Sequence, residues 1–422
     1  MSNAKTRIFC VITQGEMGGA QQFVAQLARH LDPERFTMHV VWGASSAGTL
    51  GSALPPRVSY ATAHHLGRKW SVWHDTLSIF ELRHQIREYR PDVVLCISSK
   101  AGFVGSLAAR LLRSTLPGLK IVYRIGGWTF NDPLPAWERK FYIILEKISA
   151  RWKDYIVLNN AHDLNQARAL GIRPGRGLLR IYNGLDPYMA FAPRDEARSF
   201  LDERASGELR APSYDWLVGT VANLYPTKDI PTLVRAAARV GGNVRFVVIG
   251  DGIQRPLIER LIKQYGLTGR FLLLGRIKDA GRYISAFDVF VLPSAKEGFP
   301  WALLEAMAER VPAVATRIGA VPEMLEDGVS GFVCEPGNEE QLAHSIVQLL
   351  GNDKLRQDMA IAAHQQVISK FSLREMIHQY ERLFTLDDTL PLGDAPRLPD
   401  DTAHRERPVY GPKTSPSERR GV

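Results

Sequence analysis

Short apolar runs alternate with amphipathic helical patterns along most of the chain. Such runs are typical of strands buried on both faces, and apolar positions three and four residues apart are typical of helices packed on them. In the first half, the runs predict strands at 7–13, 36–42, 93–97, 121–125, 155–158 and 178–182. In the second half, they predict strands at 216–222, 245–249, 271–274, 289–292, 313–316 and 331–334. This alternation predicts an α/β protein with Rossmann-like, doubly wound parallel sheets.

The length of 422 residues exceeds what one hydrophobic core usually holds, so two domains of about 190 residues are expected. The polar segment 193–213 separates the two halves and is expected to hold a helix at 194–201 followed by a loop. A final helix is expected at 373–384. Six prolines and many charges predict that the tail, 387–422, is disordered.

The composition, 45% hydrophobic and 23% charged, is that of a soluble globular protein. The net charge of +9 is concentrated in residues 1–190, which hold 24 Lys and Arg against 13 Asp and Glu. A basic first half favours a phosphate-rich partner or an anionic membrane surface. No nucleic-acid motif accompanies the scattered cations, so no nucleic-acid partner is expected. Three separated cysteines and the absence of a leader-like start indicate a cytoplasmic protein.

One stretch combines strand, turn and helix signals with two acidic residues. Glu297 follows the run 287–292 in a turn that ends at Pro300, which is expected to open a helix carrying Glu305. Ligands bind at the carboxyl edge of open α/β sheets, where free amides such as those of residues 298–301 suit anionic or polyhydroxyl groups. Two glutamates at this spacing are usually ordinary solvated acids, but here the flanking elements agree with a site.

This stretch resembles the Glu-x7-Glu signature of the retaining glycosyltransferases of family 4, also called group 1. The resemblance implies a GT-B fold, in which two Rossmann-like domains face each other across a cleft. It further implies an acceptor-binding domain at 1–190 and a nucleotide-sugar donor-binding domain at 191–370, with the helix at 371–386 crossing back to the first domain.

Two further motifs suit a diphosphate. Gly18 and Gly19 follow the first strand, where glycine lets a backbone approach a phosphate, although tight turns use glycine for geometry alone. Lys228 precedes a helix N-terminus, where a cation is unfavourable unless an anion joins it or the side chain points away. The segment resembles the family's Gly-Arg-Leu…Lys motif, with Asn223 in place of the usual arginine.

The remaining candidates rest on the resemblance. Arg124 stands where many relatives have a histidine that touches the donor sugar, and its guanidinium could instead contact a diphosphate or an acidic acceptor. The predicted catalytic residues are Glu297, Lys228 and Arg124. The predicted donor-binding residues are Gly18, Gly19, Asn223, Lys228, Gly250, Arg276, Ile277, Glu297, Gly298, Phe299, Pro300, Trp301 and Glu305.

The expected function is that of a retaining, metal-independent glycosyltransferase with no cofactor. It would transfer a sugar from a nucleotide diphosphate-sugar, in the first place a UDP-sugar, to a glycan or lipid-linked glycan in polysaccharide or cell-envelope synthesis. Glu305 would bind the ribose hydroxyls, Glu297 would face the donor sugar, and Lys228 and the Gly18-Gly19 loop would neutralise the diphosphate. The alternatives are a sugar-nucleotide epimerase on the same fold and an inactive sugar-nucleotide-binding relative.

Two aromatic stretches bear on membrane contact. The segment 66–73 is expected to be a loop whose Trp70 and Trp73, with two cations, suit peripheral contact with an anionic membrane surface. The helical stripe of Trp137, Phe141, Ile144, Leu145, Ile148 and Trp152 could do the same, but such a stripe more often packs on a sheet, and this is the expectation here.

Overall fold

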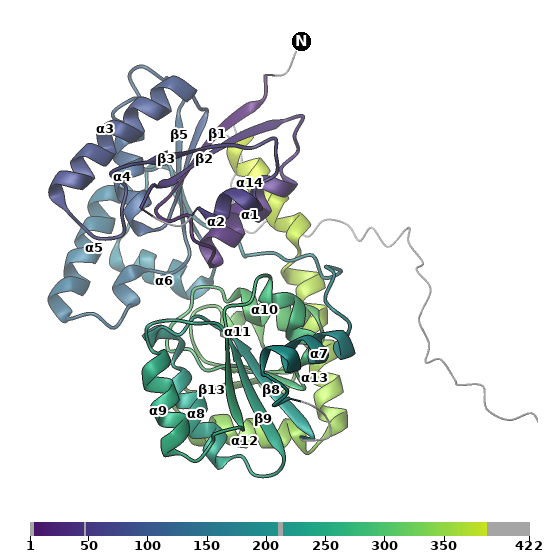
Figure 1. Ribbon diagram of the computed structural model, residues 1–422. Coiled ribbons are helices and arrows are strands. Elements are labelled where there is room, and N and C mark those ends of the chain that lie inside the picture. Colours follow the sequence, from purple (N-terminus) through teal and green to yellow (C-terminus); the bar gives the residue numbers. More distant parts are fainter. Residues whose placement is uncertain (1–3, 46–47, 210–213, 386–422) are drawn as a thin grey trace, which may run out of the picture. The chain divides into compact units, whose positions relative to one another are not determined.

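The strands of the first half form one seven-stranded parallel sheet, seen in the upper part of Figure 1. The computed structural model describes residues 4–45, 48–209 and 214–385. The sheet order is β3-β2-β1-β4-β5-β6-β7. Its strands are β1 (Thr6–Ile12), β2 (Phe36–Gly43), β3 (Ser59–Ala63), β4 (Val93–Ile97), β5 (Lys120–Ile125), β6 (Tyr155–Leu158) and β7 (Gly177–Arg180). Its helices are α1 (Gly19–His30), α2 (Thr49–Ala53), α3 (Val72–Tyr89), α4 (Ser99–Arg110), η1 (Thr129–Asn131), α5 (Ala136–Ala150) and α6 (Ala161–Leu170).

The second half forms a six-stranded parallel sheet, ordered β10-β9-β8-β11-β12-β13 (Figure 1). Its strands are β8 (Trp216–Val221), β9 (Val244–Ile249), β10 (Phe271–Gly275), β11 (Val289–Leu292), β12 (Ala313–Thr316) and β13 (Phe332–Cys334). Its shorter helical elements are η2 (Pro226–Lys228), η3 (Ala280–Ala286), α10 (Trp301–Ala308) and α11 (Val321–Met324). Its longer helices are α7 (Arg194–Arg204), α8 (Ile230–Arg239), α9 (Arg255–Gln264), α12 (Glu339–Leu350), α13 (Asp353–Lys370) and α14 (Leu373–Thr385).

The predicted fold class, two Rossmann-like doubly wound parallel sheets, is confirmed. Each sheet contributes its own buried apolar cluster, because parallel sheets are covered by helices on both faces. The strand missing from the prediction is β3, an edge strand whose residues are mostly exposed and which therefore lacks an apolar run. The described residues form one compact unit, so the predicted domain boundary near residue 190 stays a prediction. The predicted disordered tail, 387–422, lies outside the described residues.

The last helix, α14, packs on elements of the first sheet. The Lys120 ammonium donates to the carbonyl oxygens of Leu383 at 3.0 Å and Phe384 at 3.2 Å. The Tyr380 ring lies 5.1 Å from the ring of Phe23 on α1. Buried aromatic contacts of this kind contribute about 1 kcal/mol each beyond their burial. The chain therefore begins and ends, among its described residues, around the same sheet.

Two expectations about aromatic segments are wrong. The segment 66–73 is only partly a loop, because α3 begins at Val72 and includes Trp73. The stripe on α5 does not pack on the sheet: Trp137, Phe141 and Ile144 are 69%, 47% and 55% exposed. The inward face of α5 is formed instead by residues that include Glu146, Ser149 and Ala150. None of the described helices is both long and apolar enough to span a bilayer.

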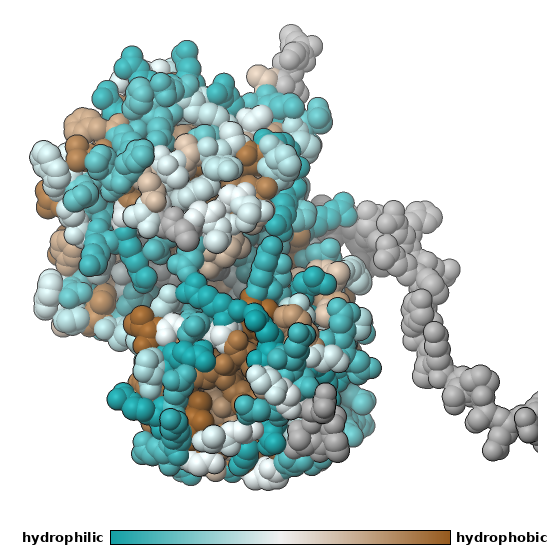
Figure 2. All heavy atoms as spheres, viewed as in Figure 1, coloured by the Kyte–Doolittle hydropathy of each residue, from teal (hydrophilic) through white to brown (hydrophobic). Residues whose placement is uncertain are grey.

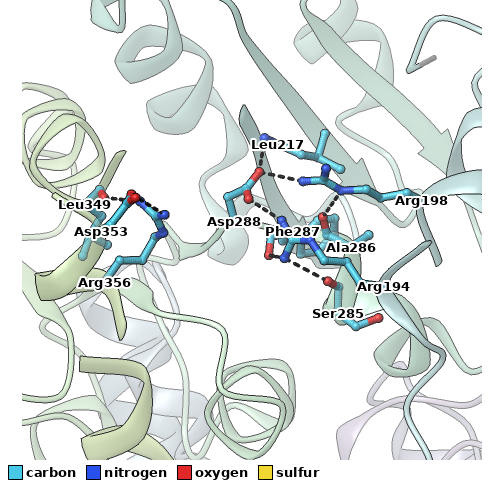
Figure 3. A network of polar contacts seen from close by, with 10 residues as sticks. All are labelled: Arg194, Arg198, Leu217, Ser285, Ala286, Phe287, Asp288, Leu349, Asp353 and Arg356. Atoms are coloured by element: carbon cyan, nitrogen blue, oxygen red, sulfur yellow. Dashed lines mark hydrogen bonds and ion pairs between the residues drawn. The ribbon is translucent and has the colours of Figure 1, made fainter. Parts of the chain in front are cut away.

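A buried aspartate fastens α7 to the second sheet (Figure 3). Asp288, which precedes β11, accepts hydrogen bonds from the Leu217 amide at 2.7 Å and from the Arg198 guanidinium at 2.9 Å, and it pairs with Arg194. Its side chain is only 8% exposed. A desolvated carboxylate is stable only with such partners, so the buried Asp288 depends on these contacts.

Replacement of Asp288 tests how much this residue contributes to the stability of the fold. We expect Asp288→Ala to lower the free energy of unfolding by about 3 kcal/mol, because it leaves the Leu217 amide without its acceptor and removes the ion pairs of Arg194 and Arg198. Asp353→Ala is the matched control, since Asp353 pairs with Arg356 but is 74% exposed, and it should cost less than about 1 kcal/mol. Urea unfolding measures both, and equal losses would contradict this assignment.

Candidate active site

The candidate residues of the second sheet gather where its strand order reverses. The chain runs outward from β8 to one edge and then from β11 to the other, so the carboxyl ends of these neighbouring strands form the topological switch point. Asn223 and Lys228 follow β8, and Glu297 follows β11. Ligands of open α/β sheets bind at such a point because the loops diverge there.

Lys228 and Glu297 form an ion pair at this point. The Lys228 Nζ lies 2.5 Å from Glu297 Oε1, and Ser294 Oγ donates to the same oxygen at 2.9 Å. The two side chains are 26% and 11% exposed, respectively. The cation is therefore held beside the N-terminus of α8 by a carboxylate, which accounts for a charge that would be unfavourable there alone.

The loop 297–301 lies against backbone on both sides. A Cβ on Gly298 would come 1.7 Å from the Gly126 carbonyl oxygen, and one on Gly319 would come 2.1 Å from the Glu297 carbonyl oxygen. Only glycine permits these approaches. Asn160 and Asn183 donate to the carbonyl oxygens of Gly298 and Phe299 at 3.3 and 3.4 Å. The loop is thus fixed by residues of both halves of the chain.

Two amides of this loop are available to a ligand. Gly298 and Phe299 are buried, and neither backbone N–H donates to an acceptor within the described residues. Buried amides are almost always hydrogen-bonded, so an unpaired pair is a mark of a binding site. Pro300 is the N-cap of α10 and not its first residue, which corrects the sequence prediction by one position. The capping geometry leaves the helix N-terminus open to an acceptor.

Glu305 on α10 is the most deeply buried acid of the site. Its side chain accepts a hydrogen bond from Gln22 of α1 at 3.0 Å, and a Cβ on Gly281 would come 2.6 Å from its Oε2. Burial raises the pKa of the Glu305 carboxyl to about 7, and the Gln22 amide opposes this shift. A carboxylate that is desolvated and only partly paired is suited to accept further hydrogen bonds from a polar ligand.

The two predicted glycines of the first half lie at the same place. Gly18 is the N-cap of α1 in extended conformation, and Gly19 begins the helix. The indole of Trp301 donates to the Gly19 carbonyl oxygen at 3.0 Å, and a Cβ on Gly19 would come 3.1 Å from the indole ring. The two segments are therefore in direct contact, and their common role in binding a donor stays a prediction.

The remaining donor-site candidates surround the ends of β8, β9 and β10. Gly250 has a φ of 147°, and a Cβ there would come 2.0 Å from the Ala222 carbonyl oxygen. The exposed Arg276 forms an ion pair with Glu16 of the first half at 2.5 Å. Ile277 is half-buried and Asn223 is exposed. These residues lie on neighbouring strand ends, whereas their contact with a nucleotide stays a prediction.

Among the described residues, no hydrogen bond joins the Arg124 side chain to the loop 297–301. Its guanidinium is buried, lies 4.2 Å from the Phe23 ring centroid and donates to Asn183 Oδ1 at 2.6 Å. Burial lowers the pKa of this guanidinium, and the nearby Tyr380 opposes that shift. Because Asn183 in turn donates to the Phe299 carbonyl oxygen, Arg124 reaches the loop through one intermediate side chain.

Several residues at this site carried no sequence signal. Gln22 is separated from Glu305 by 283 positions, and a lone glutamine on a helix face gives no indication of such a contact. Lys296 donates to the Trp128 carbonyl oxygen at 2.7 Å and pairs with Asp132. Glu323 of α11 also accepts hydrogen bonds from the Ala161 amide and the Tyr182 hydroxyl, both at 2.7 Å.

The switch point of the first sheet, between β1 and β4, carries a hydroxyl pair. The side-chain oxygens of Thr13 and Ser98 lie 2.6 Å apart. Ser98 has a φ of 84°, which is strained for any residue with a side chain and is common at functional sites. Within the described ranges, no group of His, Cys, Asp and Glu side chains could hold a metal ion.

The raised pKa of Glu305 makes a prediction about stability. The folded protein binds this proton more tightly than the unfolded chain, whose glutamate has a pKa of 4.5. Ionisation of Glu305 therefore lowers the free energy of unfolding. This loss is small below pH 4.5, grows as the pH rises and is complete above about pH 7. Glu305→Gln removes this cost of ionisation. The free energy of unfolding of the variant, relative to the wild type, should therefore be about 2 kcal/mol higher at pH 8 than at pH 5.

Thermal or urea unfolding of both proteins at the two pH values measures this difference. Gln22→Ala is the control, because loss of its amide should strengthen the pH dependence instead of removing it. A stability difference between Glu305→Gln and wild type that does not change with pH would contradict the assigned pKa.

Two family models match successive parts of the chain. The model described as glycosyl transferase 4-like domain matches residues 18–184, and the model described as glycosyl transferases group 1 matches residues 202–366. The second model includes Lys228, Glu297 and Glu305.

Named relatives match over different lengths. The chain is 27% identical over 230 residues to N-acetyl-alpha-D-glucosaminyl L-malate synthase of Bacillus anthracis, which covers 54% of this chain and 57% of that protein. It is 26% identical over 390 residues to the UDP-Gal:alpha-D-GlcNAc-diphosphoundecaprenol alpha-1,3-galactosyltransferase of Escherichia coli, which covers 91% of this chain and 97% of that protein.

Solved structures share the fold. Anabaena Alr3699/HepE in complex with UDP-glucose superposes with a TM-score of 0.74 at 22% identity, over 90% of this chain and 100% of that chain. The two parallel sheets and the two consecutive family matches point to the same family. The chain belongs to the group 1, GT4-like, glycosyltransferases and is a transferase with the GT-B fold.

Proposed function

We propose that this protein transfers a sugar from a UDP-sugar to a hydroxyl of a glycan or lipid-linked glycan, with retention of anomeric configuration. The reaction would serve polysaccharide or cell-envelope synthesis. The name of the Escherichia coli relative contains a UDP-sugar donor and a diphosphoundecaprenol-linked acceptor, and the Anabaena structure contains UDP-glucose. These names support the choice of substrate class.

The observation that carries the proposal is the grouping of one cation, two unpaired buried amides and one desolvated carboxylate around the loop 297–301 and helix α10. A nucleotide diphosphate-sugar presents ribose hydroxyls at one end and phosphates at the other. Glu305 is suited to accept from the hydroxyls, because a carboxylate is a stronger acceptor than an amide. Lys228 and the amides of Gly298 and Phe299 are suited to the phosphates.

The Lys228–Glu297 pair explains how the site tolerates its charges before the donor arrives. A diphosphate would compete with Glu297 for the Lys228 ammonium, since two acceptors then share one cation. Glu297 would keep its hydrogen bond from Ser294 but lose part of its ion pair with Lys228. Its carboxylate could then accept a hydrogen bond from a hydroxyl of the donor sugar. Binding of the donor therefore redistributes one existing ion pair and does not require a new cation.

In the proposed reaction, the acceptor oxygen attacks the anomeric carbon on the same face from which the diphosphate departs. The bond from that carbon to the phosphate oxygen breaks, and the proton of the acceptor hydroxyl passes to the leaving phosphate. No side chain forms a covalent intermediate. The protein stabilises the charge that develops on the leaving diphosphate, which is usually the largest electrostatic contribution to catalysis.

Asn223 and Arg124 mark where this chain departs from the family pattern. The exposed Asn223 lacks the charge of the usual arginine, so more of the phosphate charge falls to Lys228 and the loop amides. Arg124 acts as a positioning residue, because its contact with Asn183 supports the carbonyl oxygen of Phe299. We propose that these contacts replace a metal ion, and that the protein works peripherally at the cytoplasmic face of a membrane when its acceptor is lipid-linked.

The experiment that tests the proposal measures UDP release and product formation from UDP-galactose, UDP-glucose and UDP-N-acetylglucosamine, with GlcNAc-diphosphoundecaprenol as acceptor. We expect acceptor-dependent UDP release, an α-linked product by NMR, and full activity in excess EDTA. Lys228→Gln should lower kcat by on the order of 10²-fold, as loss of a charge-stabilising donor does elsewhere. Lys278→Gln, the control, should not.

Three results would argue against this account. Loss of activity in EDTA that Mn²⁺ restores would contradict the proposed metal-free mechanism. Conversion of the nucleotide-sugar without UDP release would favour the epimerase, and tight binding without any turnover would favour the inactive relative.

A further inference from the structure

Helix α5 turns apolar residues toward solvent and a charged residue toward the protein. Trp137, Phe141, Ile144 and Ile148 recur at helical spacing and are each 47% exposed or more. On the buried face, Glu146 is 8% exposed, accepts from the Tyr123 hydroxyl at 3.1 Å and pairs with the Lys153 ammonium at 3.4 Å. This orientation is the reverse of that of an ordinary surface helix. We call the four outward residues the apolar stripe.

Three cations surround a hollow beside the end of this stripe. Lys147, Arg151 and Arg173 line it together with Leu170 and the Gly171 turn after α6. All three cations are exposed, and none forms an ion pair within the described residues. Cations usually find an acidic neighbour, so their convergence without one makes a site of positive potential. We call these three residues the basic hollow.

The stripe and the hollow form one continuous surface. Ile148 of the last turn of α5 lies between Lys147 and Arg151, the C-cap residue. The exposed Arg139 and Lys140 flank the start of the stripe. Figure 2 shows apolar residues along the left edge, where Figure 1 places the helices α3 and α5. Apolar side chains with a cationic border are the composition that interfacial helices use.

The start of α3 extends this surface. Trp70 lies edge-on to Phe103 at 5.7 Å and 6.4 Å from Tyr142 of α5, with the Lys100 ammonium 4.6 Å from its ring centroid. Trp70 is therefore a structural residue, half-buried between α4 and α5. Trp73 and Val72, which follow it, are 71% and 88% exposed. The exposed residues of the segment 66–73, and not Trp70, are the ones available to a partner.

We propose that the apolar stripe and the basic hollow bind an anionic lipid leaflet, with the stripe in the interface and a lipid phosphate in the hollow. The charge of the surface decides the partner. Residues 1–190 carry 24 Lys and Arg against 13 Asp and Glu, so the first half attracts an anionic surface at long range. A phosphate suits three unpaired cations, and acyl chains suit exposed tryptophan, phenylalanine and isoleucine.

The consequence for the transferase rests on the proposed function. If the acceptor is lipid-linked, a leaflet held along α5 presents that acceptor to the half of the chain that the family resemblance assigns to acceptor binding. The docking itself does not require any particular sugar donor. It can therefore be tested separately from transfer.

The test is flotation of the full-length protein with vesicles of phosphatidylcholine alone and with 30 mol% phosphatidylglycerol, at 0.05 and 0.5 M NaCl. We expect binding only to the anionic vesicles and a steep loss at high salt, where the Debye length falls below about 5 Å. UDP affinity by calorimetry, measured on every variant, reports on the donor site and on folding.

Two triple variants address the two parts of the surface. Lys147→Gln, Arg151→Gln and Arg173→Gln together should lower the vesicle partition coefficient by on the order of 100-fold. Phe141→Ser, Ile144→Ser and Ile148→Ser together should abolish the binding that remains at 0.5 M NaCl on anionic vesicles. The controls replace exposed residues of the second half. Arg260, Lys263 and Lys354 to Gln remove the same charge as the cation variant, and Ile361 and Ile368 to Ser remove two exposed isoleucines. They should change little.

Each outcome decides the proposal. Loss of vesicle binding in both triple variants with unchanged UDP affinity supports it. A wild-type protein that binds UDP but stays free of anionic vesicles overturns the docking and leaves the proposed transfer intact. Retention of vesicle binding by the triple variants, or equal losses in the controls, also overturns it. Vesicle binding without UDP binding in the wild type would support the surface and contradict the donor site.

Discussion

The constraint on which the site depends is the contact of two backbones at Gly298 and Gly126. No side chain fits between them, since a Cβ on Gly298 would lie 1.7 Å from the Gly126 carbonyl oxygen. The loop 297–301 is thereby held against the first half of the chain, and Asn160 and Asn183 complete the contact from that side. This contact fixes the positions of Glu297, at the start of the loop, and of Glu305, on the helix that follows. An interior packed to this density transmits small displacements instead of absorbing them.

Desolvation supplies the second constraint. The site holds a carboxylate whose pKa burial raises to about 7, with a single side-chain amide as its partner. The protein thus carries an electrostatic cost that a ligand with hydroxyl donors can relieve. The Lys228–Glu297 pair has the same logic, because each charge is satisfied by the other until a phosphate competes for the cation. Such desolvated groups lower the stability of the folded protein but strengthen its binding of a ligand that satisfies them.

Strong local patterns made much of the fold predictable from the sequence. The apolar runs predicted the strands on both sides of each switch point, and the turn-and-helix signals around Glu297 predicted α10 to within one residue. The edge strand Ser59–Ala63 was missed because it lacks an apolar run. The orientation of α5 was predicted wrongly, because helical spacing reveals a stripe but not which way it faces. Gln22 could not be predicted, since nothing local links it to Glu305.

The central claim is that the Glu305 carboxylate accepts hydrogen bonds from the ribose hydroxyls of the nucleotide. Until a nucleotide binds, the carboxylate accepts a hydrogen bond from Gln22. Calorimetric titration of UDP into wild type, Glu305→Gln and Gln22→Ala tests it most directly. The account predicts that Glu305→Gln weakens UDP binding by about 1–2 kcal/mol, because an amide accepts hydroxyl hydrogen bonds less strongly than a carboxylate. Gln22→Ala should bind UDP as tightly as wild type or more tightly, since it removes a competitor for the carboxylate. Equal UDP affinity in wild type and Glu305→Gln would contradict the account.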